Sequence, residues 1–186
     1  MLQENNIYMM HNKIINPQEV VSISVPLYKS IQGKYFVGQT GTLTVCNKSD
    51  AWASLLNPHG SGIDLFVNVF TISNFSDNTL TAEIWLNVNP PKKECISNKI
   101  SPTNTALKPL PHNKAEIRFV DSTTEVPQGG VNVYERIVPP NTTLVGEEDG
   151  KFIHAPGGNY TIVIRSTCLQ PSKVIVALGW WEKPIC

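Results

Sequence analysis

Four cysteines carry the clearest potential chemistry in this sequence, because thiols can bind metals, act as nucleophiles or form disulfides. They are Cys46, Cys95, Cys168 and Cys186. No two of them form a CxxC pair, and none has a histidine at metal-ligand spacing, so we expect no zinc site. Two alternatives remain open. All four are reduced, two of them buried, or Cys186 at the end of the chain forms a disulfide between molecules after release from the cell.

The sequence lacks the common catalytic motifs. It contains no G-x-S-x-G elbow, no HExxH pair and no phosphate-binding Walker loop. The histidines lie in turn-like contexts: His11, His59, His112 and His154. The acidic run at residues 147–149 lacks EF-hand spacing, so a solvated turn is expected there. We therefore expect no enzyme, no bound metal and no cofactor.

Adjacent tryptophans, Trp180 and Trp181, are the most informative aromatic pair. They end an apolar run at residues 173–181, and neighbouring side chains of a strand point to opposite faces. One indole is expected in the core and the other facing outward. Trp85 likewise lies on the otherwise polar face of its strand. An exposed indole favours a subunit contact or stacking on a sugar, and the alternative is that the same chain covers it.

Short strands are expected along most of the chain, because apolar and polar residues alternate between turn signals. Hydrophobic residues make up 41% and charged residues 16%, which suits strands better than long helices. The expected strands are residues 21–25, ended by Pro26, then 34–37, 42–46, 63–73, 79–88, 114–121, 131–138, 142–145, 151–154, 160–166 and 173–181.

Three segments need separate mention. Residues 63–73 and 79–88 are expected to pair as a hairpin around the turn at 74–78. Residues 51–56 fit either a helical turn capped by Asp50 or a short strand. Residues 90–113 are a crossover or binding loop. The strand count predicts an all-β fold, an antiparallel two-sheet sandwich of jelly-roll type.

The first residues form an extended N-terminal arm (1–17) before a sandwich domain (18–186). The arm carries the apolar residues Ile7, Tyr8, Met9, Met10, Ile14 and Ile15. So apolar a segment is poorly solvated in water, which favours docking on its own body or on a neighbouring subunit. The alternative is a frayed tail.

Charge limits the choice of partners. Fifteen basic and fifteen acidic side chains give zero net charge without a basic cluster, so a nucleic-acid partner is not expected. A neutral surface tolerates self-association. The N-terminus lacks the basic and apolar regions of a secretory signal, and no stretch has the length of a membrane span. The chain is therefore expected to be made in the cytosol without a signal peptide.

Residues 33–40 (GKYFVGQT), 65–76, 136–143 (RIVPPNTT) and 179–182 (GWWE) together resemble an uncharacterised bacterial family from spore-forming Gram-positive species. The resemblance covers most of the chain after about Val25 and implies no activity or site. The plan of a sandwich with an N-terminal arm also looks like the subunits of endospore appendages, in which arms and disulfides link successive jelly rolls. Those arms carry cysteines, whereas residues 1–17 here contain none.

Two functions follow as hypotheses. The first is a structural subunit that assembles with copies of itself into a fibre or coat at the spore or cell surface, through its arm, its strand edges and the exposed tryptophans. The second is a carbohydrate-binding or adhesion module, in which Trp85 or Trp181 stacks on a glycan and residues 90–113 shape the site.

Overall fold

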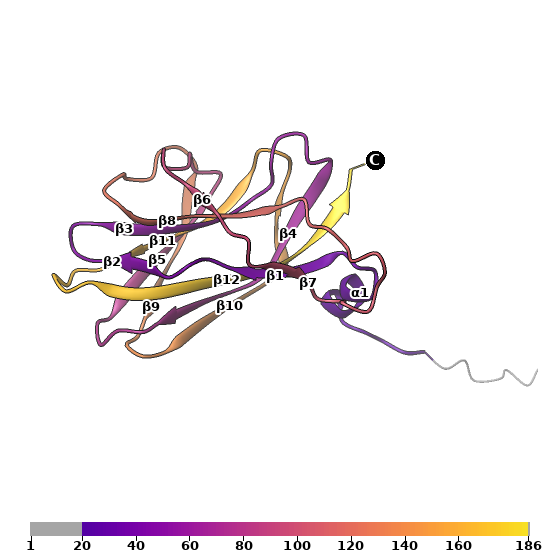
Figure 1. The fold of residues 1–186 in the computed structure, drawn as a ribbon, viewed down its shortest axis with the longest axis horizontal. Helices are drawn as coiled ribbons and strands as arrows, with labels where there is room; N and C mark the ends of the chain where they lie inside the picture. The colour runs from indigo at the N-terminus through magenta and orange to yellow at the C-terminus, as the bar shows by residue number, and fades with distance from the viewer. Residues whose placement is uncertain (1–19, 186) are drawn as a thin grey trace, which may run out of the picture.

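Residues 20–185 are described by the computed structural model, and strands make up most of this part of the chain (Figure 1). Six strands form one antiparallel sheet, called sheet I here. Its order is β10-β4-β12-β1-β7, and β2 also pairs with β12. The strands are β1 (Tyr35–Gln39), β2 (Leu43–Val45), β4 (Ile63–Asn74), β7 (Ile100–Pro102), β10 (Thr143–His154) and β12 (Ser172–Pro184).

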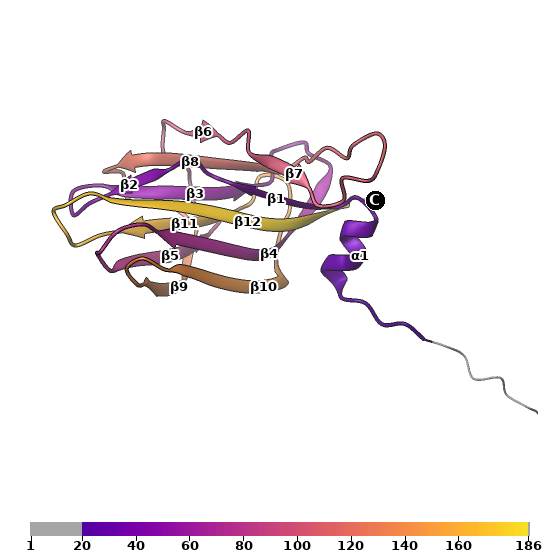
Figure 2. The same ribbon diagram turned by 60° about the horizontal axis from the view of Figure 1, so that its bottom comes forward.

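Six further strands form a second antiparallel sheet, called sheet II, in the order β6-β8-β3-β11-β5-β9. They are β3 (Asp50–Leu56), β5 (Leu80–Leu86), β6 (Cys95–Ile96), β8 (Glu116–Thr123), β9 (Val131–Val138) and β11 (Asn159–Arg165). One helix, α1 (Val25–Ile31), lies at one end of the sandwich beside β1 and β7 (Figures 1 and 2).

The chain passes repeatedly from one sheet to the other. Strands β1 and β2 lie in sheet I, β3 in sheet II, β4 in sheet I and β5 in sheet II, and the same alternation runs from β9 to β12. Each sheet therefore interleaves early and late strands, as in β10-β4-β12-β1 and β9-β5-β11-β3. This is the strand order of a jelly roll, so the predicted fold class is confirmed.

The main core lies between the two sheets and holds the inward side chains of both. Trp180, Tyr160 and Phe70 are its largest fully buried members. Inward residues alternate with outward ones along β4 and β12, which is the pattern that the sequence displayed. A smaller apolar cluster covers the outer face of sheet II. It consists of Trp52, Trp85, Val88, Val120 and Val163.

The strand expected at residues 21–25 is wrong. Residues 20–24 have no regular structure, and α1 begins at Val25. Alternating valine and isoleucine with serine fits a strand, but Ser24 followed by Pro26 also fits a helix start. The Ser24 side chain caps the helix, and proline is tolerated in a first turn because its missing N–H would be unpaired there.

The expected hairpin is also wrong, although both of its strands exist. β4 pairs with β10 and β12, whereas β5 pairs with β9 and β11. The turn after Asn74 carries the chain from one sheet to the other. The buried Asn74 side chain shapes it, accepting from the Ser76 N–H (3.0 Å) and donating to the carbonyls of Asn78 (2.8 Å) and Pro139 (3.0 Å).

Three smaller expectations are resolved. Residues 51–56 form a strand, and the long segment after Pro90 contains β6 and β7. The two strands expected on either side of residues 147–150 are one strand, β10, with a bulge between Glu147 and Phe152. The acidic turn is not wholly solvated, because Glu148 is buried and accepts a hydrogen bond from Tyr160 (3.1 Å). Burial raises the pKa of the Tyr160 phenol, and Glu148 adds to the effect.

No helix within residues 20–185 is both long and apolar enough to cross a bilayer.

Candidate assembly surfaces

Helix α1 forms for local reasons. The Ser24 hydroxyl accepts from the Leu27 N–H (3.5 Å), and the Tyr28 N–H donates to the Ser24 carbonyl (3.0 Å). The helix ends at Ile31 with Gln32 as its C-cap, and Gly33 follows with a φ of +69°, a conformation that glycine adopts without strain. Seven residues make two turns, too few to be stable alone, so contacts must hold the helix in place.

The contacts that hold α1 to the sandwich include several polar ones. The hydroxyls of Thr103 and Ser30 lie 2.8 Å apart, and the Asn104 amide donates to the Ile31 carbonyl (3.4 Å). At the C-terminal end, the Lys34 N–H donates to the Lys29 carbonyl (2.9 Å). The segment after β7 thus forms hydrogen bonds with the helix, and these fix the orientation of the helix at the end of the sandwich.

Apolar side chains of this segment face solvent. No residue of α1 is buried, and the large apolar residues before and within it have exposed fractions between 44% and 81%. They are Val20, Val21, Ile23, Val25, Leu27, Tyr28 and Ile31, called the N-terminal apolar surface here. Contiguous apolar exposure of this kind marks an interaction surface. The sequence did not lead us to predict this surface, although Ser24 and Pro26 are typical of a helix start.

The arm residues predicted to dock lie outside the described residues. They are Ile7, Tyr8, Met9, Met10, Ile14 and Ile15. In the sequence, the stretch 16–19 (NPQE) separates them from the N-terminal apolar surface.

The edge strand β9 offers a second kind of contact. It pairs with β5 on one side and has no strand partner on the other within residues 20–185. Nearly all of its residues are exposed, including Val131 and Ile137. An edge with free backbone groups and apolar side chains is a template for pairing with another strand.

Trp180 and Trp181 point to opposite faces of β12, as predicted. Trp180 is fully buried between the sheets and stacks on Phe36, with the ring centres 6.0 Å apart. Trp181 lies on the outer face between Tyr35 (6.5 Å) and Phe66 (5.3 Å), and only 5% of it is exposed. The expectation that one of the two indoles is exposed is therefore wrong, because side chains of the same chain cover Trp181. Neither ring is free to contact a partner or a sugar.

Gly150 completes the cover of Trp181. Its φ is +76°, and a Cβ atom there would overlap the Trp181 indole. We expect Gly150→Ala to lower the free energy of unfolding by about 2 kcal/mol more than Gly60→Ala. Gly60 is a matched control, because its φ is +77° and open space surrounds it. Urea denaturation of both variants measures the difference, and equal losses would show that Gly150 does not pack on the indole.

Trp85 is half-buried rather than free. Its ring packs on the apolar cluster outside sheet II, and its N–H donates to Glu83 (2.8 Å). Glu83 also pairs with Arg165 (2.7 Å), which reaches Asp50 (3.1 Å). Trp85 is thus hydrogen-bonded to a row of charged side chains, Glu83, Arg165 and Asp50, on this outer face. A polar hollow of about 250 Å³ beside Arg165 continues the row.

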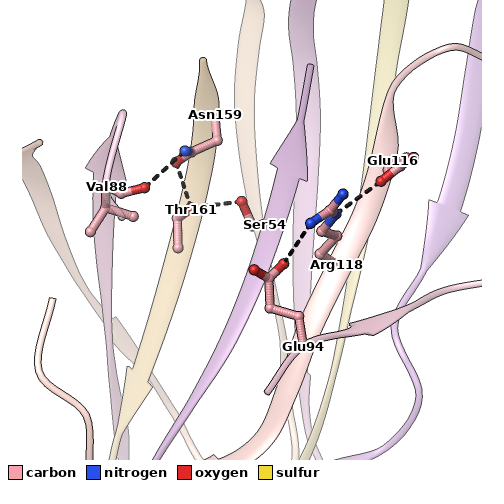
Figure 3. Close-up of polar contacts among 7 residues, drawn as sticks. All are labelled: Ser54, Val88, Glu94, Glu116, Arg118, Asn159 and Thr161. Carbon is pink, nitrogen blue, oxygen red and sulfur yellow. Dashed lines mark hydrogen bonds and ion pairs between the residues drawn. The ribbon is translucent and has the colours of Figure 1, made fainter. Parts of the chain in front are cut away.

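Hydrogen bonds hold the loop that follows β5 against the outer face of sheet II (Figure 3). Asn159 donates to the Val88 carbonyl (2.9 Å), and the Thr161 hydroxyl lies 2.9 Å from the Asn159 amide oxygen and 2.8 Å from the Ser54 hydroxyl. Arg118 contacts Glu116 (2.9 Å) and Glu94 (3.5 Å).

Beneath this loop lies Trp52. It is buried, and the adjoining space is about 10 Å³, which is the size of a water molecule and not of a sugar ring. This part of the face therefore leaves no room for a glycan.

Two of the cysteines lie on neighbouring segments, because the N–H of Asn47, next to Cys46, donates to the Cys168 carbonyl (2.8 Å). Cys46, Cys95 and Cys168 are free thiols, and Cys186 lies outside the described residues. Cys95 is exposed on the short edge strand β6, while Cys46 and Cys168 are half-buried. The Ser49 hydroxyl, 3.3 Å from the Cys46 sulfur, lowers the pKa of that thiol. A disulfide between molecules stays a prediction, and the lowered pKa favours the thiolate form of Cys46.

Titratable groups do not gather elsewhere in the part of the chain that the structure describes. No three of its histidine, cysteine, aspartate or glutamate side chains lie together as metal ligands would. His154 is buried, with its Nδ1 atom 3.3 Å from the Asn87 amide oxygen, and burial lowers its pKa to about 4.

Comparison with known proteins gives one match. Residues 6–186 match the model of a family described as "Family of unknown function (DUF6143)". No curated protein and no solved structure matched the chain. The matched region includes the sandwich, α1 and part of the arm. Since this match spans nearly the whole sequence, the protein belongs to this family of unknown function.

Proposed function

We propose that this protein is a non-enzymatic structural subunit, which assembles with copies of itself into a fibre or coat at the spore or cell surface. The observation that carries the proposal is the N-terminal apolar surface. Seven large apolar side chains in twelve residues are exposed on a segment that polar contacts hold in a defined orientation. A soluble monomer gains nothing from this arrangement, whereas a subunit covers it with a neighbour.

Burial of these side chains would favour assembly. Covering the remaining exposed area of a half-exposed valine, leucine or isoleucine stabilises a contact by about 1 kcal/mol. Seven such side chains supply several kcal/mol, and the arm residues add to this. The N-terminal apolar surface and the β9 edge lie on different parts of the sandwich. Contacts between unlike surfaces repeat from copy to copy without closing, so the expected product is a filament.

Replacing two residues of the helix tests the proposal. We expect the Leu27→Glu, Ile31→Glu double variant to lose assembly, because two carboxylates cannot be buried in an apolar contact. Both side chains are exposed, so the fold should stay intact. Sedimentation velocity of the full chain across a hundredfold range of concentration measures the outcome, with thermal unfolding as the check on folding.

A matched control changes two apolar residues that are more exposed than Leu27 and Ile31 and belong to loops at the opposite end of the sandwich. These are Phe75, after β4, and Leu169, in the connection from β11 to β12 (Figure 1). The Phe75→Glu, Leu169→Glu variant adds the same charge and should assemble like the wild type. If both variants assemble, or if both fail, the N-terminal apolar surface is not the contact.

Glycan binding is the second candidate function. The row of Trp85, Glu83 and Arg165 on the outer face of sheet II favours it, because an aromatic ring beside charged groups suits a sugar. A glycan array would support this reading if wild type bound and Trp85→Ala did not. An array without hits, repeated on the assembled protein, would contradict a glycan-binding function.

A further inference from the structure

A shallow hollow crosses the outer face of sheet I. Two adjoining depressions of about 520 and 190 Å³ share Val37, Gly38 and Ala177, so they form one continuous groove over β7, β1, β12 and β4. The floor carries small residues, since outward positions of β12 hold Ala177 and Gly179. We call this feature the sheet I groove.

Most of the exposed surface of the sheet I groove is apolar, although the polar residues Gln39, Thr71, Asn98 and Ser101 also line it. The solvent face of an antiparallel sheet is normally polar, with apolar residues turned to the core. Here Val37 and Val69 occupy outward positions beside Ala177 and Gly179, and Lys99 is the one charged residue lining the groove. Gly179 is closely surrounded, because a Cβ atom there would lie 2.7 Å from the Tyr35 hydroxyl and 2.8 Å from Val69. A surface of this composition is suited to being covered.

The first nineteen residues of the chain have the composition and length to cover it. Residues 1–19 contain two acidic side chains and one basic one, Glu4, Glu19 and Lys13, so little charge would be desolvated. Nineteen extended residues span about 60 Å, and β12, with thirteen residues, spans about 43 Å. The segment can therefore cross the whole sheet.

The direction of the chain indicates whether the groove is filled by the segment of the same chain or by that of a neighbouring copy. Residues 20–24 lead away from the sandwich in both views, and Val20 and Val21 are among the most exposed residues (Figures 1 and 2). To reach the groove of its own sheet, the chain would have to reverse at this point. Docking on a neighbouring copy requires no such reversal after residues 20–24.

We infer that the sheet I groove receives the N-terminal segment, residues 1–19, of a second copy of this chain. This deepens the proposed function, on which it rests, by naming the two surfaces that meet. The segment and the groove lie on different parts of one molecule, so each copy donates a segment to one neighbour and accepts a segment from another.

Two full-length variants test this inference, and each of them lacks one half of the contact. In the donor variant, Ala177→Arg places a long charged side chain on the groove floor and leaves the segment intact. In the acceptor variant, Met9, Met10, Ile14 and Ile15 are all replaced by Asp, and the groove is intact. Each variant alone should remain monomeric. Their equimolar mixture should form a dimer of about 41 kDa, twice the 20.6 kDa of the chain, by light scattering after size exclusion.

Each outcome is decisive. If the mixture stays monomeric although both variants melt near the wild-type temperature, the groove does not receive the segment of another copy. If either variant still assembles alone, the inference is overturned while self-assembly stands. Leu169→Arg controls for the added arginine, since it is exposed outside the groove, and should assemble normally. Only a monomeric wild type would defeat the proposed function itself.

Discussion

The Glu182→Ala variant is expected to lose about 4 kcal/mol of unfolding free energy, a large part of the stability of a typical domain. The Glu182 carboxylate is buried at the end of β12 and accepts three donors. They are the N–H groups of Lys114 (2.9 Å) and Ala115 (2.9 Å) and the Trp180 indole N–H (3.1 Å). Removing the carboxylate leaves all three without an acceptor, and each unpaired buried group costs about 1–3 kcal/mol. Urea denaturation measures the loss.

Two controls separate hydrogen bonding from other effects. Glu182→Gln keeps the shape and one acceptor oxygen, so it should lose clearly less than the alanine variant. Lys183→Ala changes the next residue, which is exposed, and should leave stability within about 0.5 kcal/mol of wild type. An alanine variant at Glu182 as stable as wild type would show that water or other groups satisfy the three donors, and would refute this account of the sandwich end.

Acidification is expected to remove about 3 kcal/mol of stability through His154. Burial lowers its pKa from 6.5 to about 4. Between these values the unfolded chain binds a proton that the folded chain does not, so stability is full above pH 6.5 and falls as the pH drops toward 4. Each pKa unit corresponds to about 1.4 kcal/mol, which gives the stated total. Denaturation series at several pH values between 7 and 4 measure the slope.

The His154→Leu variant isolates this contribution. It retains an apolar side chain in the buried site and removes the titrating group, so its stability should change less between pH 7 and pH 4 than that of wild type. The Asn87 amide oxygen keeps a partner, because it also accepts from the Asn159 N–H (3.2 Å). Parallel pH profiles for the two proteins would contradict a neutral, buried His154.

The fold was largely predictable because strand alternation is a local property. Residues 131–138 and 160–166, for example, form strands close to the expected bounds. Strand pairing is not local. The turn after Asn74 has the sequence of a hairpin turn, but the strand pairings show that it crosses between the sheets, with Asn74 contacting Asn78 and Pro139. Residues 21–25 failed for a different reason, since a strand and a capped helix start compete for the same short pattern.

The candidate site was less predictable, because exposure depends on distant parts of the chain. Trp181 was expected to be exposed from its position in the strand. Phe66, Tyr35 and Gly150, all more than thirty residues away, cover it. The same limitation hid the N-terminal apolar surface and the sheet I groove. The groove exists because small residues of β12 face outward beside Val37 and Val69, which no single strand reveals.

The central claim is that this protein assembles with itself, and negative-stain electron microscopy of the purified full-length chain tests it most directly. The account predicts filaments or extended chains of subunits in the wild type and dispersed particles for Leu27→Glu, Ile31→Glu. Adding a reductant to the wild-type sample shows whether disulfides reinforce the contacts. A uniform field of particles of the 20.6 kDa size, unchanged at high protein concentration, would contradict the account.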